Sequence, residues 1–171
     1  GYDREAGELL RELERRAERR PGGAGAFADA RRTLSVASVD HARQSGDFAR
    51  AYDEAVMALS SDPDNEKLVL ALGRVYQEGG LHREAATTYD WLLARPGPQL
   101  PARRAAVANA LAMDDVDRAE QLLEEAAPLE DGELLLLAAR TARRSGDSRS
   151  ALALAVESAS DARLADLRAL E

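Results

Sequence analysis

Apolar residues recur along the chain with the spacing of an amphipathic α-helix. In the stretch EKLVLALGRVYQEGG, residues at i, i+4, i+7 and i+8 form one apolar face: Leu68, Leu72, Val75 and Tyr76. Gly79 and Gly80 follow, and glycine ends a helix cheaply because it adopts a positive φ. The next stretch, LHREAATTYDWLLAR, has the same helical spacing. The pattern therefore predicts two helices joined by a short turn.

This pattern returns at nearly constant intervals. It is found in GDFARAYDEAVMAL (46–59), GGLHREAATTYDWLL (79–93), DDVDRAEQLLEEA (114–126) and GDSRSALALAVESA (146–159). In each, an alanine lies five residues after the turn, and successive alanines are 34, 34 and 32 residues apart: Ala51, Ala85, Ala119 and Ala151. We expect these small side chains where two helices cross closely.

The repeat predicts the organisation of the whole chain. We expect a partial repeat helix and a glycine-rich linker in residues 1–31, followed by four helix-pair units and a C-terminal capping or partial helix. The units span 32–65, 66–99, 100–131 and 132–160, and the last helix spans 161–171. A phosphate-binding loop needs a lysine, and the stretch PGGAG (21–25) has none. We therefore expect this stretch to be a linker. The chain begins in helical periodicity, as a fragment of a longer protein would.

The acidic stretch SSDPDNEK (60–67) has two interpretations, a calcium loop or a turn between helices. Counted from Asp62, a helix–loop–helix calcium loop needs glycine at position 6 and glutamate at position 12. Lys67 and Gly73 occupy those positions. Pro63 falls where a second helix should end, and Asp64 or Asn65 is placed to cap the next helix. The stretch is therefore predicted to be a turn.

Composition indicates an all-α protein of acidic character. Of 171 residues, 45% are hydrophobic but only 4% are aromatic, and Ala, Leu, Glu and Arg are strong helix formers. The net charge is −8, which argues against nucleic-acid binding. The absence of cysteine excludes disulfides and thiolate chemistry. No apolar run approaches the ~20 residues of a membrane span.

No residue pattern indicates catalysis, a cofactor or a metal. The two histidines, His41 and His82, belong to no metal-binding motif, and no nucleophile elbow occurs. His82 is expected to be a solvated residue in a turn, and Tyr76 and Tyr89 to be core residues. Trp91 is either packed between repeats or an exposed anchor. We expect a protein that is not an enzyme.

The repeated helix-pair units resemble tetratricopeptide repeats. The second unit matches that pattern at six positions: Leu72, Gly73, Tyr76, Gly80, Ala85 and Tyr89. The usual tryptophan position holds other residues in all four units: Ser35, Val69, Arg103 and Leu135. The resemblance implies an α-solenoid, a superhelical stack of antiparallel helix pairs with about 34 residues each.

In such arrays the first helix of each pair lines a concave groove for partners. Transferring those positions gives a predicted groove set: Asp40, Arg43, Lys67, Arg74, Gln77, Arg104, Arg140, Arg143 and Arg144. The planar guanidinium suits carboxylates, so an anionic peptide or polymer is one predicted partner. The alternative is that these arginines pair with Asp and Glu on neighbouring helices.

Two phrases, LALGRVYQEGGLHREAATTYDWLLARPG and LLLLAARTARRSGDSRSALAL, are similar to the cellulose synthase operon protein C family. This resemblance implies a non-catalytic periplasmic scaffold for protein–protein interaction in bacterial exopolysaccharide (cellulose) synthesis and export. Its partners would be proteins or peptides in the groove, and the exopolysaccharide itself is a further candidate. The competing hypotheses are a cytoplasmic peptide-binding regulatory module and an enzyme built on helix pairs.

Overall fold

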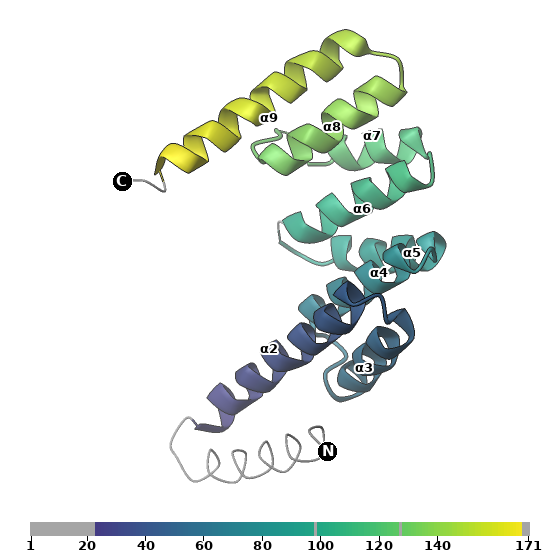
Figure 1. The fold of residues 1–171 in the computed structure, drawn as a ribbon, viewed down its shortest axis with the longest axis vertical. Helices are drawn as coiled ribbons and strands as arrows, with labels where there is room; N and C mark the ends of the chain where they lie inside the picture. The colour runs from purple at the N-terminus through teal and green to yellow at the C-terminus, as the bar shows by residue number, and fades with distance from the viewer. Residues whose placement is uncertain (1–22, 98, 127, 169–171) are drawn as a thin grey trace. The chain divides into compact units, whose positions relative to one another are not determined.

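The computed structural model describes residues 23–97, 99–126 and 128–168, and for residues 23–24, 26–27 and 160–168 only the backbone. All regular structure in these residues is helical, as Figure 1 shows. The helices are α2 (Gly23–Gln44), α3 (Phe48–Ser61), α4 (Glu66–Glu78), α5 (His82–Leu93), α6 (Leu100–Ala112), α7 (Val116–Glu124), α8 (Gly132–Arg144) and α9 (Ser148–Arg168). The predicted all-α class is confirmed for the described part of the chain.

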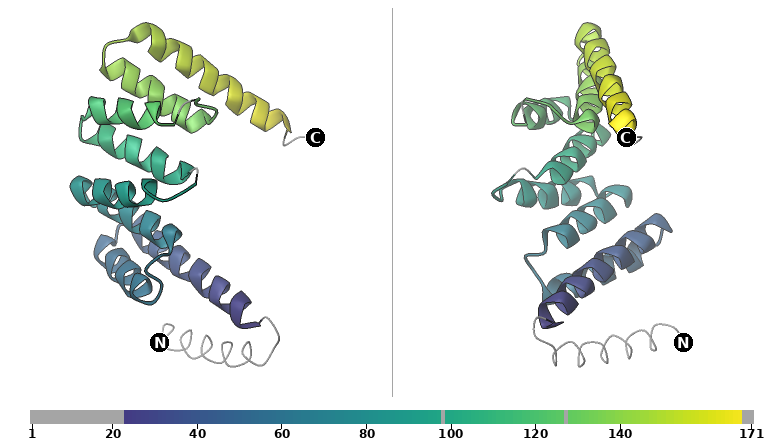
Figure 2. Two further views of the ribbon diagram at one scale, coloured as in Figure 1. Left: turned by 180° about the vertical axis from the view of Figure 1, so that it is seen from behind. Right: turned by 90° about the vertical axis from the view of Figure 1, so that its left-hand side faces the viewer.

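The chain divides into two compact units, one ending at Ala71 and the other beginning at Leu72. In the first, α2 packs against α3. In the second, each helix from α5 to α9 packs against the next, and α6 also contacts α8. Both views of Figure 2 show α8 and α9 side by side and antiparallel. The superhelical stacking of all pairs stays a prediction.

The turn inside each helix pair has the same geometry. A residue with positive φ follows the first helix: Gly46 (79°), Gly80 (80°), Asp114 (59°) and Gly146 (90°). The next backbone N–H then donates to the carbonyl five residues earlier, as in a Schellman motif. The four bonds are Asp47–Ala42 (3.0 Å), Leu81–Tyr76 (2.8 Å), Asp115–Ala110 (2.9 Å) and Asp147–Ala142 (2.9 Å). These bonds confirm the predicted turns and fix the register between pairs.

Aspartate caps the second helix of most pairs. Asp47, Asp115 and Asp147 each accept a bond of 3.1 Å from the backbone N–H three residues later. Leu81 takes the equivalent place before α5 and makes no side-chain cap. The capping aspartates satisfy N–H groups that would otherwise lack a partner at the helix start.

Small residues allow close packing between the helices. Ala51, Ala85 and Ala119 have no exposed surface, whereas Ala151 is half-buried. The ring of Tyr89, also fully buried, lies against the backbone of Gly73 on α4. Its hydroxyl donates to Gln77 Oε1 at 2.8 Å. Gly73 therefore leaves the space that the tyrosine ring fills.

The N-terminal boundary of the first pair differs from the prediction. The glycine-rich linker was expected at PGGAG (21–25), within a segment ending at residue 31, but α2 already begins at Gly23. A glycine inside a helix costs about 1 kcal/mol relative to alanine, too little to end a run rich in good helix formers. The N-terminal helix expected before residue 23 lies outside the described residues.

The C-terminal boundary also differs. A separate helix was predicted at 161–171, but α9 continues without a break from Ser148 to Arg168. No glycine or proline occurs in this stretch, so the sequence contains no helix-ending signal. Residues 169–171 lie outside the described residues. Among the described helices, none is long and apolar enough to cross a membrane.

Candidate functional site

The first unit contains three predicted groove residues, and Arg43 there has a partner on its own helix. Its guanidinium lies 3.1 Å from an Asp40 carboxylate oxygen, with side-chain exposures of 12% and 27%. This ion pair joins successive turns of α2. The charge of Arg43, which was predicted to bind a partner, is therefore balanced by Asp40. Lys67, at the start of α4, is exposed.

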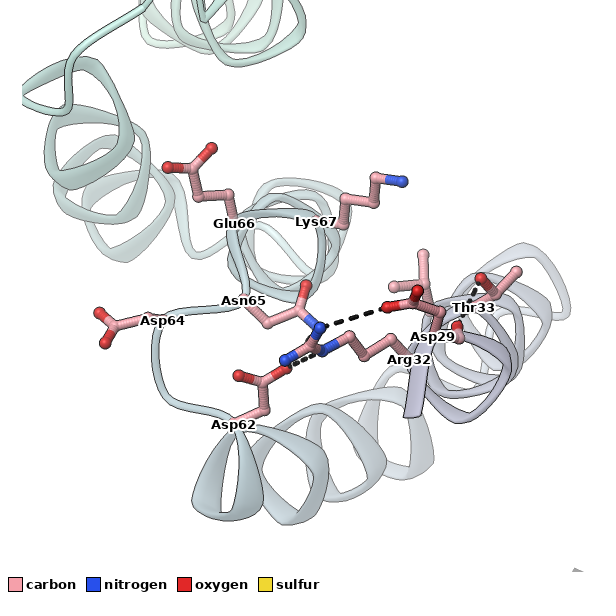
Figure 3. A pocket seen from close by; sticks show the side chains of 9 residues that line it. Asp29, Arg32, Thr33, Asp62, Asp64, Asn65, Glu66 and Lys67 are labelled. Carbon is pink, nitrogen blue, oxygen red and sulfur yellow. Dashed lines mark hydrogen bonds and ion pairs between the residues drawn. The ribbon is translucent and has the colours of Figure 1, made fainter. Parts of the chain in front are cut away.

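Lys67 borders a pocket of about 540 Å³ between α2 and the α3–α4 turn (Figure 3). Arg32 reaches across it from α2 and contacts Asp62 at 2.8 Å and Asp29 at 3.3 Å. The hydrogen bond from Arg32 lowers the pKa of Asp62 below its usual value. An internal ion pair thus lies within the pocket.

The stretch SSDPDNEK is the turn that the sequence predicts. Asn65 Oδ1 accepts from Leu68 N at 3.2 Å and so caps α4, while Asn65 Nδ2 donates to Asp62 at 3.0 Å. In the described part of the chain, no group of three or more His, Cys, Asp or Glu residues could hold a metal ion. The acidic residues here build a helix boundary.

Arg104, in the second unit, ties α6 to the beginning of α8. Its guanidinium binds both carboxylate oxygens of Asp131, one at 2.8 Å, and also Glu133 at 2.8 Å. Asp131 in turn caps α8 through Leu134 N at 2.9 Å. Burial acts to raise the pKa of Asp131, but the bonds from Arg104 and Leu134 outweigh it and lower that pKa. Arg104 therefore has a structural role between helices.

Arg144 and Gln77 are also engaged inside the protein. Arg144 donates to the carbonyl of Leu111 and to Asp114 at 3.1 Å, which fastens α8 to the α6–α7 turn. Gln77 accepts the Tyr89 hydroxyl described above. Arg74 is half-buried on α4. The alternative considered for the groove set was pairing with Asp and Glu on neighbouring helices. It is observed for Arg104, and Arg144 pairs with Asp114 in a neighbouring turn, whereas Arg43 pairs within its own helix.

Arg140 and Arg143 differ from these arginines. Both are exposed on α8, and neither forms an ion pair with a described residue. Leu136, 40% exposed, lies one turn before Arg140 on the same face. Two like charges three residues apart repel by about 0.2–0.5 kcal/mol, which a bound anion would relieve. We call Leu136, Arg140 and Arg143 the α8 face. Arg140 and Arg143 belong to the predicted groove set and are exposed, as Lys67 is, and their binding of an anionic partner stays a prediction.

His82 is not the solvated surface residue that the sequence suggested. It is half-buried, and its Nδ1 lies 2.9 Å from Oδ1 of Asn109, which is 1% exposed. Asn109 Nδ2 donates to the His82 carbonyl at 2.9 Å, so its Oδ1 accepts the Nδ1–H of the ring. Asn109 sits within an alanine-rich helix, and no sequence motif identified it as the partner of a turn histidine.

Trp91 remains 39% exposed on α5, and the guanidinium of Arg95 lies 3.8 Å from its ring centroid. This is a cation–π contact between residues four positions apart in the sequence. Arg95 therefore covers one face of the only tryptophan in the sequence.

Comparison with known proteins identifies proteins to which part of the chain is similar. No protein-family model matches it. A curated protein from Komagataeibacter xylinus is 40% identical over 90 residues, covering 52% of this chain and 7% of that protein. Its name is cellulose synthase operon protein C. The chain is similar to part of that protein.

Two further relatives have the same name. One, also from Komagataeibacter xylinus, is 42% identical over 94 residues, covering 54% of this chain and 7% of the relative. The other, from Komagataeibacter sucrofermentans, is 42% identical over 79 residues, covering 46% and 6%. The aligned part of the chain thus spans less than a tenth of the length of these relatives. The similarity predicted from sequence phrases is confirmed at this level, whereas the tetratricopeptide assignment stays a prediction.

Proposed function

We propose that this chain is a non-catalytic helical-repeat scaffold that holds protein partners within a bacterial cellulose synthesis and export system in the periplasm. The observation that carries the proposal is the 40–42% identity to proteins named cellulose synthase operon protein C. Helix pairs with a repeated turn support it, because stacked pairs present long surfaces suited to binding other proteins. The arginines and acidic residues observed between these helices hold such surfaces in place.

The α8 face is the proposed contact site in the second unit. Arg104 and Arg144 anchor the two ends of α8 to α6 and to the α6–α7 turn, so the helix is held rigidly. Arg140 and Arg143 then present guanidinium groups whose planar geometry matches carboxylates. Arg95 covers a face of Trp91, which leaves less ring for sugar stacking. An acidic protein segment is therefore the proposed partner at this face.

Reversing both charges tests this proposal in the organism that carries the gene. The double substitution Arg140→Glu and Arg143→Glu should reduce co-purification with the cellulose synthase subunits by at least ~10-fold, as expected for losing two charge-assisted contacts. Cellulose yield should fall with it. Circular dichroism should show unchanged helix content, because both side chains are exposed.

The matched control is the double substitution Arg31→Glu and Arg83→Glu, which changes net charge equally at exposed positions on α2 and α5. It should leave co-purification and cellulose yield unchanged. Equal losses in both variants would show a general charge effect and contradict the assignment to α8. Retention of partners by the α8 variant would do the same.

A further inference from the structure

The chain contains two methionines and no cysteine, so Met57 and Met113 carry all of its sulfur. Met57 is 72% exposed on α3. Met113 directly follows α6, is 41% exposed, and borders a cavity of about 220 Å³ between α5, α6 and α7. A thioether takes up an oxygen atom from a peroxide to form a sulfoxide, which adds a strong hydrogen-bond acceptor to an apolar side chain. The surroundings of each sulfur decide what that acceptor meets.

The amide of Asn109, which is 1% exposed, points at the Met113 sulfur. Its Nδ2 has two hydrogens to donate. The His82 carbonyl at 2.9 Å accepts one, and Met113 Sδ at 3.9 Å is the acceptor placed for the other. His82 Nδ1, at 2.9 Å from Asn109 Oδ1, fixes the plane of the amide. Because a thioether is a weak acceptor, this second buried N–H is held less well than the first.

The separation of these two atoms matches that in a hydrogen-bonded sulfoxide. An S–O bond of about 1.5 Å and an N–H···O contact of about 2.9 Å, meeting at about 120° at the oxygen, place sulfur and nitrogen about 3.9 Å apart. Met113 Sδ and Asn109 Nδ2 already have this separation of 3.9 Å. An oxygen added to the sulfur on the side of Asn109 therefore reaches hydrogen-bond distance while both atoms stay in place.

The cavity gives a peroxide access to this side of the sulfur. Both Asn109 and Met113 line it, and Ala106 and Ala110 form its wall on α6. The turn bonds give Ala110 the repeat position that Tyr76 has on α4, so alanine leaves open space that a tyrosine ring would fill. Hydrogen peroxide is little larger than water, whose share of liquid volume is about 30 Å³, so it fits within 220 Å³.

We propose that Met113 is a modification site for hydrogen peroxide, and that the buried amide of Asn109 holds the product. A sulfur lone pair attacks one peroxide oxygen, and the S–O bond forms as the O–O bond breaks. The departing hydroxide takes the proton of the transferred oxygen and leaves as water. Sulfur loses two electrons, the peroxide gains them, and the sulfoxide oxygen accepts the second Nδ2 hydrogen of Asn109. This inference is independent of the proposed role in cellulose synthesis.

Oxidation at Met113 strengthens the junction between α5 and α6. Asn109 already joins α6 to His82, the first residue of α5, through two hydrogen bonds. A strong acceptor for the remaining N–H fixes the amide further. Oxidation of a packed methionine normally disrupts its surroundings, so a gain of stability distinguishes this site from incidental damage. Methionine sulfoxide reductases restore the thioether, which makes the change reversible.

Two chains with one methionine each test the proposal: Met57→Leu keeps only Met113, and Met113→Leu keeps only Met57. After excess hydrogen peroxide, mass spectrometry should show one added oxygen in each. The urea midpoint of the oxidised Met57→Leu chain should rise by about 0.3–1 M, as expected for one improved hydrogen bond, and return after enzymatic reduction. The midpoint of the Met113→Leu chain should not change, because Met57 is exposed. A Met113 that resists peroxide, or a midpoint lowered by its oxidation, would overturn the proposal.

Adding Asn109→Ala to the Met57→Leu chain should reverse the sign, because the sulfoxide oxygen then lies beside apolar walls without its donor. If that chain does not fold, the stereochemistry at sulfur gives the answer. Met113 should yield at least ~90% of one sulfoxide epimer and Met57 about equal amounts, measured in digests with the two reductases that each act on one epimer. Equal epimers at Met113, or the same rise in midpoint without Asn109, would contradict the proposal.

Discussion

Replacing Gly73 by alanine is expected to lower the free energy of unfolding by about 3 kcal/mol, the upper part of the range for overpacking a core. An added Cβ would lie 3.0 Å from Tyr89 Cδ1, and closer still to Cε1. The tyrosine ring is fully buried and its hydroxyl is held by Gln77, so it cannot move aside easily. Urea denaturation followed by circular dichroism measures the loss.

The matched control is Gly25→Ala in α2. A Cβ there has no neighbour within 4 Å, and Gly25 is a helical residue. Without a clash, alanine should raise stability by up to ~1 kcal/mol through helix propensity alone. The two substitutions are chemically identical and should have opposite signs. A Gly73→Ala protein as stable as the unmodified chain would mean that Tyr89 does not pack where the structure places it.

Replacing Asn109 by alanine is expected to cost about 2–3 kcal/mol. The substitution removes the donor to the His82 carbonyl and the acceptor of the His82 ring, each at 2.9 Å. The carbonyl at the start of α5 would then lose its side-chain donor in a partly buried place. Denaturation of the variant measures the cost, and the histidine ring proton, observed by NMR, should lose its protection from exchange.

Gln121→Ala is the control for that substitution, because Gln121 also carries an amide with two partners, Arg118 and Glu125, but is exposed on α7. Its loss should change stability by less than ~0.5 kcal/mol. A cost below 1 kcal/mol for Asn109→Ala would contradict a structural role of the His82–Asn109 contact.

Local signals in the sequence predicted the helices and their turns well. Gly46, Gly80 and Gly146 marked the turns because glycine alone adopts their φ values without strain. Asp114 was identified only through the repeat spacing, since aspartate is a less specific signal. The boundary near Gly23 was misplaced because glycine also occurs inside helices when the surrounding residues favour helix strongly.

Side-chain partners were much less predictable than helices. The groove set was transferred by position along each helix, and position does not reveal that Arg104 meets Asp131, 27 residues away. The same holds for His82 and Asn109, which are joined by packing of α5 against α6. Lys67, Arg140 and Arg143 are exposed, and for these three the role suggested by position stays a prediction.

Exchange of segments with a relative tests the proposed function most directly. In Komagataeibacter xylinus, the aligned segment of about 90 residues in cellulose synthase operon protein C would be replaced by the matching residues of this chain. If this chain is a scaffold of the same kind, the chimaera should restore at least about half of the cellulose yield of a strain lacking the protein. Introducing Gly73→Ala, where the exchanged segment includes it, should reduce that yield. A chimaera present at the normal level that restores no cellulose would contradict the proposed role.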